Sequence, residues 1–453
     1  MNVTRRRFCG LLAAGAFGAG FSCRRLFGGE PSGGNVPRPT PQQLAWQDLE
    51  LGLFIHFDMP VFKPGWGHGQ YDSRPEPERY NPAHLDTDQW MEAARGMGAK
   101  YAVLTATHGS GFLQWQSDLY PYGVRQSPWR GGKGDLVRRF VESCRKHGIG
   151  PGLYAHMNVN GYLEVDNPGF VNRGRGGDPD KQARYARTCE QMVTELWSRY
   201  GPLTEIWFDG GVVSPEKGGP DLVPILRKHQ PDAIAFQSPV PGGVRWIGNE
   251  RGVAGYPCWS TVKKLNDPGA GDPDGAIWSP GECDVPLPGH GWLWTPEQNK
   301  NIKPLGQLMD MYYRSVGRNC NLLLNATPDD RGLIPEANVK HYADFGREIR
   351  RRFGNPVAET QGEGDSVEVA LKHPATIDHV IVMENVAHGE RVRAYEIEGL
   401  VPGNTWQKLC DGVSVGHKRI QQFTPTEVAK VRFRTTQTAA PPKIRRLAVF
   451  SVG

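Results

Sequence analysis

Several polar side chains that could do chemistry stand directly after short apolar runs of the chain. These residues are His56 and Asp58, His108, His156 and Asn158, Asp209, and Glu250. A single residue in such a position is equally well explained as the cap of a loop. Five or more that converge on one face of a parallel barrel are better explained as a functional site, because the active sites of such barrels lie just after the strands.

Asp209 is the sharpest candidate of this set. In the run 205–211 (Glu-Ile-Trp-Phe-Asp-Gly-Gly), three large apolar residues precede the carboxylate, and two glycines after it leave room for a ligand. A lone carboxylate could ligate a metal, but the neighbouring strand ends lack a second carboxylate at metal-like spacing. Glycoside hydrolysis instead needs two carboxyl groups, one ionised and one protonated. We predict Asp209 and Glu250 as this catalytic pair, with Glu282 as the reserve partner and no metal.

Strand and helix patterns that can position these residues alternate between residues 42 and 353. The predicted strands are 51–57, 100–106, 149–155, 203–208, 233–237, 244–247 and 321–324, and a Gly/Pro-rich excursion runs to about residue 303. The predicted helices are 86–97, 135–147, 181–200, 221–229, 305–316 and 335–353. This order predicts an α/β fold, a (β/α)8-like TIM barrel over residues 42–353. A doubly wound sheet is the alternative, but no glycine-rich phosphate loop follows the first strand.

The pattern changes after residue 362. Short runs of alternating apolar and polar residues, separated by turns, continue to the C-terminus. Such alternation predicts a small antiparallel β-sandwich over residues 362–453. This domain could bind carbohydrate or only pack against the barrel.

The composition indicates a globular protein without a transmembrane span. The chain has 453 residues, of which 38% are apolar and 22% charged, and no apolar run reaches the roughly 18 residues that a membrane helix needs. The net charge of +5 comes from five arginines within residues 1–29; without them, 48 basic residues face 48 acidic ones. A neutral chain gives no electrostatic support for binding nucleic acid.

The N-terminal segment is typical of an export signal. Residues 1–29 contain Arg5-Arg6-Arg7-Phe8 and then an uncharged run of 13 small and apolar residues, which resembles a twin-arginine signal. An amphipathic first helix is the alternative, but the run is apolar all round. We expect an exported protein, periplasmic or secreted, with Cys23 as a candidate site for a lipid anchor. Residues 30–41, rich in Pro and Gly, are predicted to be a linker.

The eight cysteines contain no C-x-x-C pair, so the sequence gives no indication of a zinc site. Cys144 falls on the apolar face of a predicted helix, and Cys320 borders an apolar strand. Buried free thiols are favoured over disulfides.

Five collinear motifs carry a resemblance to a known family. They are 51–56 (Leu-Gly-Leu-Phe-Ile-His), 98–105 (Gly-Ala-Lys-Tyr-Ala-Val-Leu-Thr), 205–211, 245–250 (Arg-Trp-Ile-Gly-Asn-Glu) and 315–319 (Ser-Val-Gly-Arg-Asn). Together they resemble the α-L-fucosidases of glycoside hydrolase family 29, most of all the branch that favours α-1,3/1,4-linked fucose. The resemblance runs from about residue 44 to 450.

The resemblance implies an enzyme, a retaining exo-α-L-fucosidase of carbohydrate metabolism that needs no cofactor. Its substrate would be a fucosylated oligosaccharide or polysaccharide, and a fucose-like sugar such as L-galactose is a second candidate. Asp209 matches the family nucleophile and Glu250 the acid/base. The predicted substrate-binding residues are His56, Trp66, His108, Trp115, Arg245 and Glu282. The competing hypothesis is a catalytically silent glycan-binding protein on the same scaffold.

Two departures from the family pattern concern sugar contacts. The family has Lys-His-His-Asp-Gly-Phe where residues 107–112 read Thr-His-Gly-Ser-Gly-Phe, so only the first histidine, His108, is kept. The family's Glu-Trp is Gly65-Trp66 in this chain. Each lost hydrogen bond is worth roughly 1–3 kcal/mol, so the preferred sugar could differ from that of the family.

Overall fold

The structure, a computed structural model, describes residues 36–67, 70–171, 178–289 and 291–453. The predicted export signal and Cys23 lie outside these residues. In the described ranges no helix is both long and apolar enough to traverse a bilayer.

Eight parallel strands form the sheet that carries the site. Their order around the sheet is β7-β6-β3-β2-β1-β12-β11-β8, and a single bridge between Phe236 and Val244 joins its two ends. The barrel is therefore nearly closed, which confirms the predicted (β/α)8-like fold. The strands are β1 (Leu51–Ile55), β2 (Tyr101–Thr107), β3 (Gly150–Ala155), β6 (Glu205–Trp207), β7 (Ile234–Phe236), β8 (Arg245–Trp246), β11 (Gly281–Pro286) and β12 (Cys320–Ala326).

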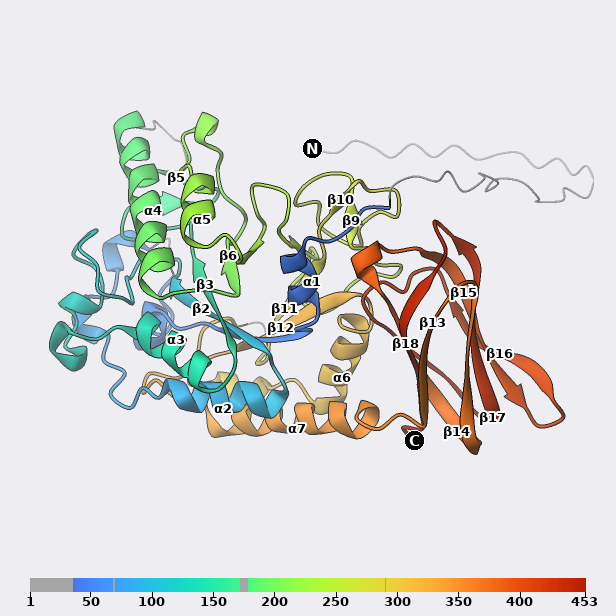
Figure 1. The fold of residues 1–453 in the computed structure, drawn as a ribbon. Helices are drawn as coiled ribbons and strands as arrows, with labels where there is room; N and C mark the ends of the chain where they lie inside the picture. The colour runs from blue at the N-terminus through green and yellow to red at the C-terminus, as the bar shows by residue number, and fades with distance from the viewer. Residues whose placement is uncertain (1–35, 68–69, 172–177, 290) are drawn as a thin grey trace, which may run out of the picture.

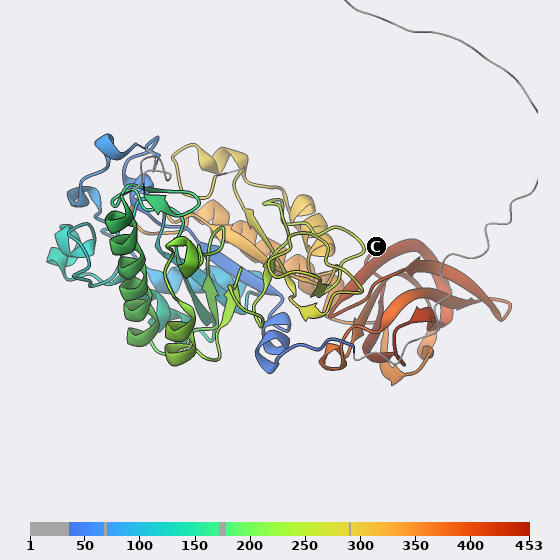
Figure 2. The ribbon, with the colours of Figure 1, turned by 90° about the horizontal axis from the view of Figure 1, so that it is seen from above.

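Helices cover the outside of this sheet (Figures 1 and 2). They are α1 (Pro41–Gln47), α2 (Thr87–Met97), α3 (Leu136–Lys146), α4 (Pro179–Arg199), α5 (Val223–His229), α6 (Leu305–Arg314) and α7 (Glu336–Phe353). Helix α2 shows how the sequence sets their ends. The side chain of Asp86 caps its first turn by accepting from the backbone N–H groups of Asp88 and Gln89, and Gly98 ends it at a φ of 92°.

Two elements of the barrel were missed by the sequence pattern. Helix α1 begins at Pro41, the last residue of the predicted linker. Strand β11 falls inside the predicted Gly/Pro-rich excursion, and it pairs with both β12 and β8. Its six residues are all buried, so the barrel needs it as the eighth strand.

The second domain is the predicted antiparallel β-sandwich, with strand order β13-β18-β14-β17-β15-β16. Its apolar core includes Val380, Ile397, Val431 and Leu447, none more than 1% exposed. It follows α7 directly and lies at the opposite end of the molecule from α4 (Figure 1). The strands are β13 (Ala358–Glu363), β14 (Ser366–Glu384), β15 (Val392–Val401), β16 (Thr405–Gly412), β17 (Arg419–Thr438) and β18 (Lys443–Phe450).

Buried polar groups fasten the sandwich to the barrel. The Glu390 carboxylate, 1% exposed, accepts from the backbone N–H of Ser260 at 2.9 Å and from Asn319 Nδ2 at 2.5 Å. Phe353 at the end of α7 packs edge-on against Phe450, with ring centroids 5.4 Å apart. Contact with the barrel is thus one role of the sandwich.

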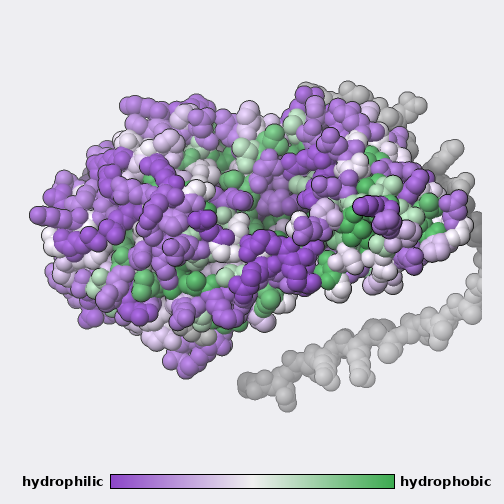
Figure 3. Space-filling view, turned by 60° about the horizontal axis from the view of Figure 1, so that its bottom comes forward, coloured by the Kyte–Doolittle hydropathy of each residue, from purple (hydrophilic) through white to green (hydrophobic). Residues whose placement is uncertain are grey.

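The surface of the described residues is mostly polar, as the predominance of purple in Figure 3 shows for one face. Among their large apolar side chains, only Val357 and Val413 are exposed. The six cysteines within these residues are free thiols, and all but Cys410 are buried.

Candidate active site

A pocket of about 300 Å³ opens at the carboxyl ends of the barrel strands. This is the end where barrels of this class carry their functional residues. The side chains that line it are Phe54, His56, His108, Tyr154, His156, Trp207, Asp209, Glu250, Asp284, Trp292 and Leu293. The structure therefore brings together five of the polar residues that the sequence placed after strands: His56, His108, His156, Asp209 and Glu250.

Asp209 follows β6, and its side chain is 47% exposed to the pocket. The Tyr154 hydroxyl donates to its Oδ2 at 3.0 Å, and Asn158 Nδ2 donates to its backbone oxygen at 2.9 Å. Gly210, at a φ of 69°, turns the chain directly behind it, and a Cβ there would stand 2.7 Å from Asn158 Nδ2. The carboxylate is thus held in one orientation on a rigid strand end, as a nucleophile requires.

Glu250 lies on the loop after β8 and is exposed. Gly248 and Gly252, at φ values of 87° and 68°, flank it. The indole Nε1 of Trp292 donates to its Oε2 at 3.1 Å. The second predicted carboxyl group therefore reaches the same pocket from a loop rather than from a strand.

His56 is neutral, and its protonation is defined by Asn325. Nδ1 of His56 lies 2.7 Å from Asn325 Oδ1, while Asn325 Nδ2 donates to the backbone oxygen of Trp292 at 2.9 Å. The amide oxygen can only accept, so Nδ1 carries the hydrogen and Nε2 is left as an acceptor. Burial lowers the pKa of His56 to about 4. Its Nε2 can therefore accept a hydrogen bond from a sugar hydroxyl.

His108 lies beside a buried carboxylate that the family motif does not contain. Its Nδ1 is 3.8 Å from Oδ2 of Asp58, and the Asp58 carboxylate also accepts from the hydroxyl and backbone N–H of Ser110. Ser110 stands where the family has aspartate. The carboxylate beside His108 and Ser110 therefore comes from the chain after β1.

Three aromatic side chains of the wall each precede a polar pocket residue by two positions. Phe54 precedes His56, Tyr154 precedes His156, and Trp207 precedes Asp209. Residues two apart on a strand point to the same side, so each pair projects into the barrel together. The sequence analysis missed Phe54, Tyr154 and Trp207 as pocket residues, and this spacing is the signal that would have found them.

A carboxyl group beneath the pocket, that of Glu282, binds the indole N–H of Trp207 in its floor. Glu282 accepts from Trp207 Nε1 at 2.8 Å and from the Tyr101 hydroxyl at 2.5 Å. Tyr101 reaches across the barrel because it passes over Gly52, where a Cβ would meet its ring at 2.4 Å. Burial raises the pKa of Glu282 to about 7. Glu282 therefore supports Trp207 from below.

Four predicted substrate-binding residues do not line the pocket. Glu282, which is also the reserve acid/base, is fully buried under Trp207. Arg245 is fully buried and donates to the backbone oxygens of Trp259 at 2.8 Å and Gly269 at 3.1 Å.

The two predicted sugar-stacking rings are also placed elsewhere. The fully buried Trp115 donates to Glu195 of α4 at 2.7 Å, among the helices. Trp66 is 6% exposed and donates to the backbone oxygen of Gln70 at 3.1 Å. Trp292, which the sequence analysis did not select, stands in the pocket beside His56, with ring centroids 4.9 Å apart.

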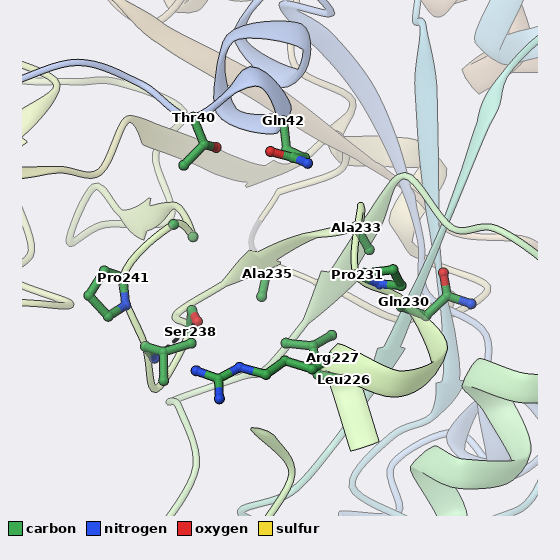
Figure 4. Close-up of a pocket in the computed structure, with 13 residues that line it drawn as sticks. Thr40, Gln42, Leu226, Arg227, Gln230, Pro231, Ala233, Ala235, Ser238 and Pro241 are labelled. Atoms are coloured by element: carbon green, nitrogen blue, oxygen red, sulfur yellow. Dashed lines mark hydrogen bonds between the residues drawn. The ribbon is translucent and has the colours of Figure 1, made fainter. Parts of the chain in front are cut away.

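A second hollow, of about 330 Å³, lies outside the barrel between the start of α1, the end of α5 and the loop after β7 (Figure 4). Its one charged lining residue is Arg227, and the others include Leu226, Ala235 and Pro241. It holds no carboxyl group that could act as an acid or a nucleophile. Of these two hollows, only the first therefore holds carboxyl groups that the sequence analysis selected.

A (β/α)8 barrel with carboxyl groups and aromatic rings gathered at its strand ends has the architecture of a glycoside hydrolase. The family model for Alpha-L-fucosidase matches residues 37–351. The chain therefore belongs to the α-L-fucosidase family, glycoside hydrolase family 29.

Individual relatives are consistent with this family assignment. "Alpha-L-fucosidase 1" of Arabidopsis thaliana is 30% identical over 437 residues, which cover 86% of this chain and 82% of that protein. The crystal structure titled "putative alpha-L-fucosidase" from Bacteroides thetaiotaomicron VPI-5482 is of a chain 42% identical to this one. The match covers 92% of this chain and 100% of that chain, with a TM-score of 0.87. A glycoside hydrolase 29 family member from an unknown rumen bacterium is 29% identical, with coverage of 94% and 78% and a TM-score of 0.79.

Proposed function

We propose that this protein is a retaining exo-glycosidase that releases α-linked L-fucose from glycans. The observation that carries the proposal is the presence of Asp209 and Glu250 in one pocket, on a chain of the α-L-fucosidase family. A volume of about 300 Å³ is at the small end of ligand sites. It suits one terminal sugar better than an internal stretch of a polymer.

The proposed reaction proceeds in two displacements. Asp209 attacks the anomeric carbon and forms a glycosyl ester, while Glu250 gives its proton to the departing glycosidic oxygen. Glu250, now ionised, takes a proton from water, and that water displaces Asp209 to give the free sugar. Nε2 of His56 accepts a hydrogen bond from a hydroxyl group of the sugar, and the rings of Phe54 and Trp292 face the apolar surface of the sugar.

The preferred sugar and linkage are finer parts of the proposal. Fucose with an α-1,3 or α-1,4 linkage is the first choice, on the resemblance of the sequence motifs. L-Galactose is the second, because Gly65 and Gly109 supply no side chain where the family has hydrogen-bonding groups. His156, in the pocket with its ring centroid 5.7 Å from that of His108, is a polar group that could contact the sugar in their place.

Release of nitrophenol from aryl α-L-fucoside and aryl α-L-galactoside by the purified protein tests the proposal. We expect turnover of the fucoside, and proton NMR taken early in the reaction should show the α-anomer first. Turnover of neither sugar, with glycan binding intact, would favour the silent glycan-binding protein. The β-anomer as first product would exclude the double displacement.

We also propose that the protein leaves the cytoplasm already folded, on the basis of its twin-arginine motif. Replacing both Arg5 and Arg6 with lysine should leave active enzyme in the cytoplasmic fraction, because the conservative change keeps the charge and removes the recognised pair. The measurement is fucosidase activity in cell fractions, with Arg24→Lys/Arg25→Lys as the matched control. Unchanged export of the double variant would refute the twin-arginine assignment.

A lipid anchor at Cys23 has a separate test. Radiolabelled fatty acid incorporated by wild type and absent from Cys23→Ser would establish the lipid anchor.

A further inference from the structure

Asp284 is a third carboxyl group of the pocket, and the proposed reaction does not use it. It lies on β11 two residues after Glu282, so both side chains project into the barrel. Glu282 lies below the floor, whereas Asp284 lines the pocket itself. Its exposed fraction is 3%, so only a small part of the carboxyl group can meet a ligand.

One oxygen of this carboxyl group is already held in place. The indole Nε1 of Trp246, on the neighbouring strand β8, donates to Asp284 Oδ1 at 2.7 Å. Among the described residues no other side chain donates to this carboxyl group, and its remaining contact is with its own backbone N–H. The side chain is thus fixed through one oxygen, and the other is available to a molecule in the pocket.

The surroundings favour the protonated form of Asp284. Asp209 and Glu250 share the pocket, and no lysine or arginine lines it. Carboxyl groups that share one pocket repel one another when all are ionised. Burial, first of all, raises the pKa of Asp284 well above its usual range, and the negative charges of Glu282 and Glu250 add to this. His56 is neutral and brings no compensating charge.

We propose that Asp284 is a substrate-binding residue that donates a hydrogen bond from its second carboxyl oxygen to a hydroxyl group of the bound sugar. The inference rests on the proposed glycosidase function and adds a contact to it. The protonated carboxyl group offers a donor, whereas the Nε2 of His56 offers an acceptor. The pocket therefore offers the sugar both a hydrogen-bond donor, Asp284, and a hydrogen-bond acceptor, His56.

The comparison of Asp284→Asn with Asp284→Ala tests this role. An asparagine can accept from Trp246 through its oxygen and donate to the sugar through its nitrogen, so kcat/KM for aryl α-L-fucoside should stay within about threefold of wild type. The alanine variant loses the donor and should fall by roughly 10- to 100-fold. Circular dichroism and thermal unfolding establish that each variant is folded.

Substrates that lack single hydroxyl groups give a second readout, which a merely structural role would not move. For aryl fucosides deoxygenated at C2, C3 or C4 in turn, wild type should lose about tenfold at the contacted position, the value of one hydrogen bond. Asp284→Ala should lose nothing further for that one substrate, and Asp284→Asn should behave as wild type. Equal sensitivity of wild type and alanine variant at all three positions would overturn the contact.

The outcomes for the two proposals are separable. An active wild type whose folded asparagine variant is as impaired as the alanine variant would overturn the neutral donor and leave the glycosidase function intact. An inactive wild type would overturn the glycosidase function. Calorimetric binding of L-fucose to the wild type and the two variants would then test the Asp284 contact. If Asp284 donates to the sugar, wild type and Asp284→Asn should bind L-fucose tightly and Asp284→Ala should not.

Discussion

Replacing Asp209 with alanine should lower kcat/KM for aryl α-L-fucoside by roughly 10⁴-fold or more, as removal of a nucleophile does in other enzymes. Among the pocket carboxyl groups, only Asp209 is on a strand end and oriented by a hydroxyl donor, Tyr154. Glu250 is on a loop, and Asp284 is bound to Trp246. Neither can replace it as the attacking group. The measurement is steady-state kinetics at substrate concentrations well below KM.

The Asp209 variant should remain folded, because its side chain is half exposed and belongs to the pocket rather than to the apolar core. Tyr154→Phe is the matched control: it removes the hydrogen bond, keeps the ring and should cost only about tenfold. In Asp209→Ala, added azide can then attack the anomeric carbon of the bound fucoside directly and should give the inverted β-fucosyl azide. A folded variant with more than a small fraction of wild-type activity would move the nucleophile elsewhere.

Replacing Glu250 with alanine should produce a loss that depends on the leaving group. Substrates with a sugar or alkyl leaving group need its proton and should slow by roughly 10²- to 10⁴-fold, the usual contribution of general acid catalysis. A fucoside with an acidic dinitrophenol needs no proton, so formation of the glycosyl-enzyme should change little. Azide, which needs no general base, should restore turnover and yield the retained α-fucosyl azide.

Trp292→Phe is the matched control for Glu250, since it removes only the indole N–H that holds Oε2. We expect a smaller loss, with the same ratio between good and poor leaving groups. Glu282→Gln should show no azide rescue at all, because Glu282 is fully buried beneath Trp207. Rescue of a Glu282 variant and not of Glu250→Ala would reverse the acid/base assignment.

Four polar residues of the site could be found from the sequence, because each of them follows a recognisable strand. His56, His108, His156 and Asp209 all come after runs in which apolar residues are continuous, as expected for strands buried on both faces. The family resemblance then supplied the roles. The contacts of large side chains were not predictable in the same way. From the sequence, Trp115 is equally consistent with a ring that stacks on a sugar and with a ring packed among helices.

Strand β11 escaped prediction for a related reason. Its residues Gly281-Glu282-Cys283-Asp284-Val285-Pro286 carry two acids and end in proline, which by composition indicates a loop. In the folded barrel both acids face inward, where burial favours their neutral forms and indole N–H groups donate hydrogen bonds to them. The same misreading hid Asp284 as a pocket residue and made Glu282 look accessible.

The carboxylate of Glu390 also bears on how the enzyme can be engineered. It is a sandwich residue, yet it satisfies the backbone N–H of Ser260 and the side chain of Asn319, both buried in the barrel. Asn319 directly precedes β12, the strand that carries Asn325 and, through it, orients His56. A protein shortened after α7 would lose this acceptor and expose the barrel surface that the sandwich covers. The catalytic barrel is therefore a poor candidate for a minimal enzyme, and fusions or deletions are better placed at the far edge of the sandwich.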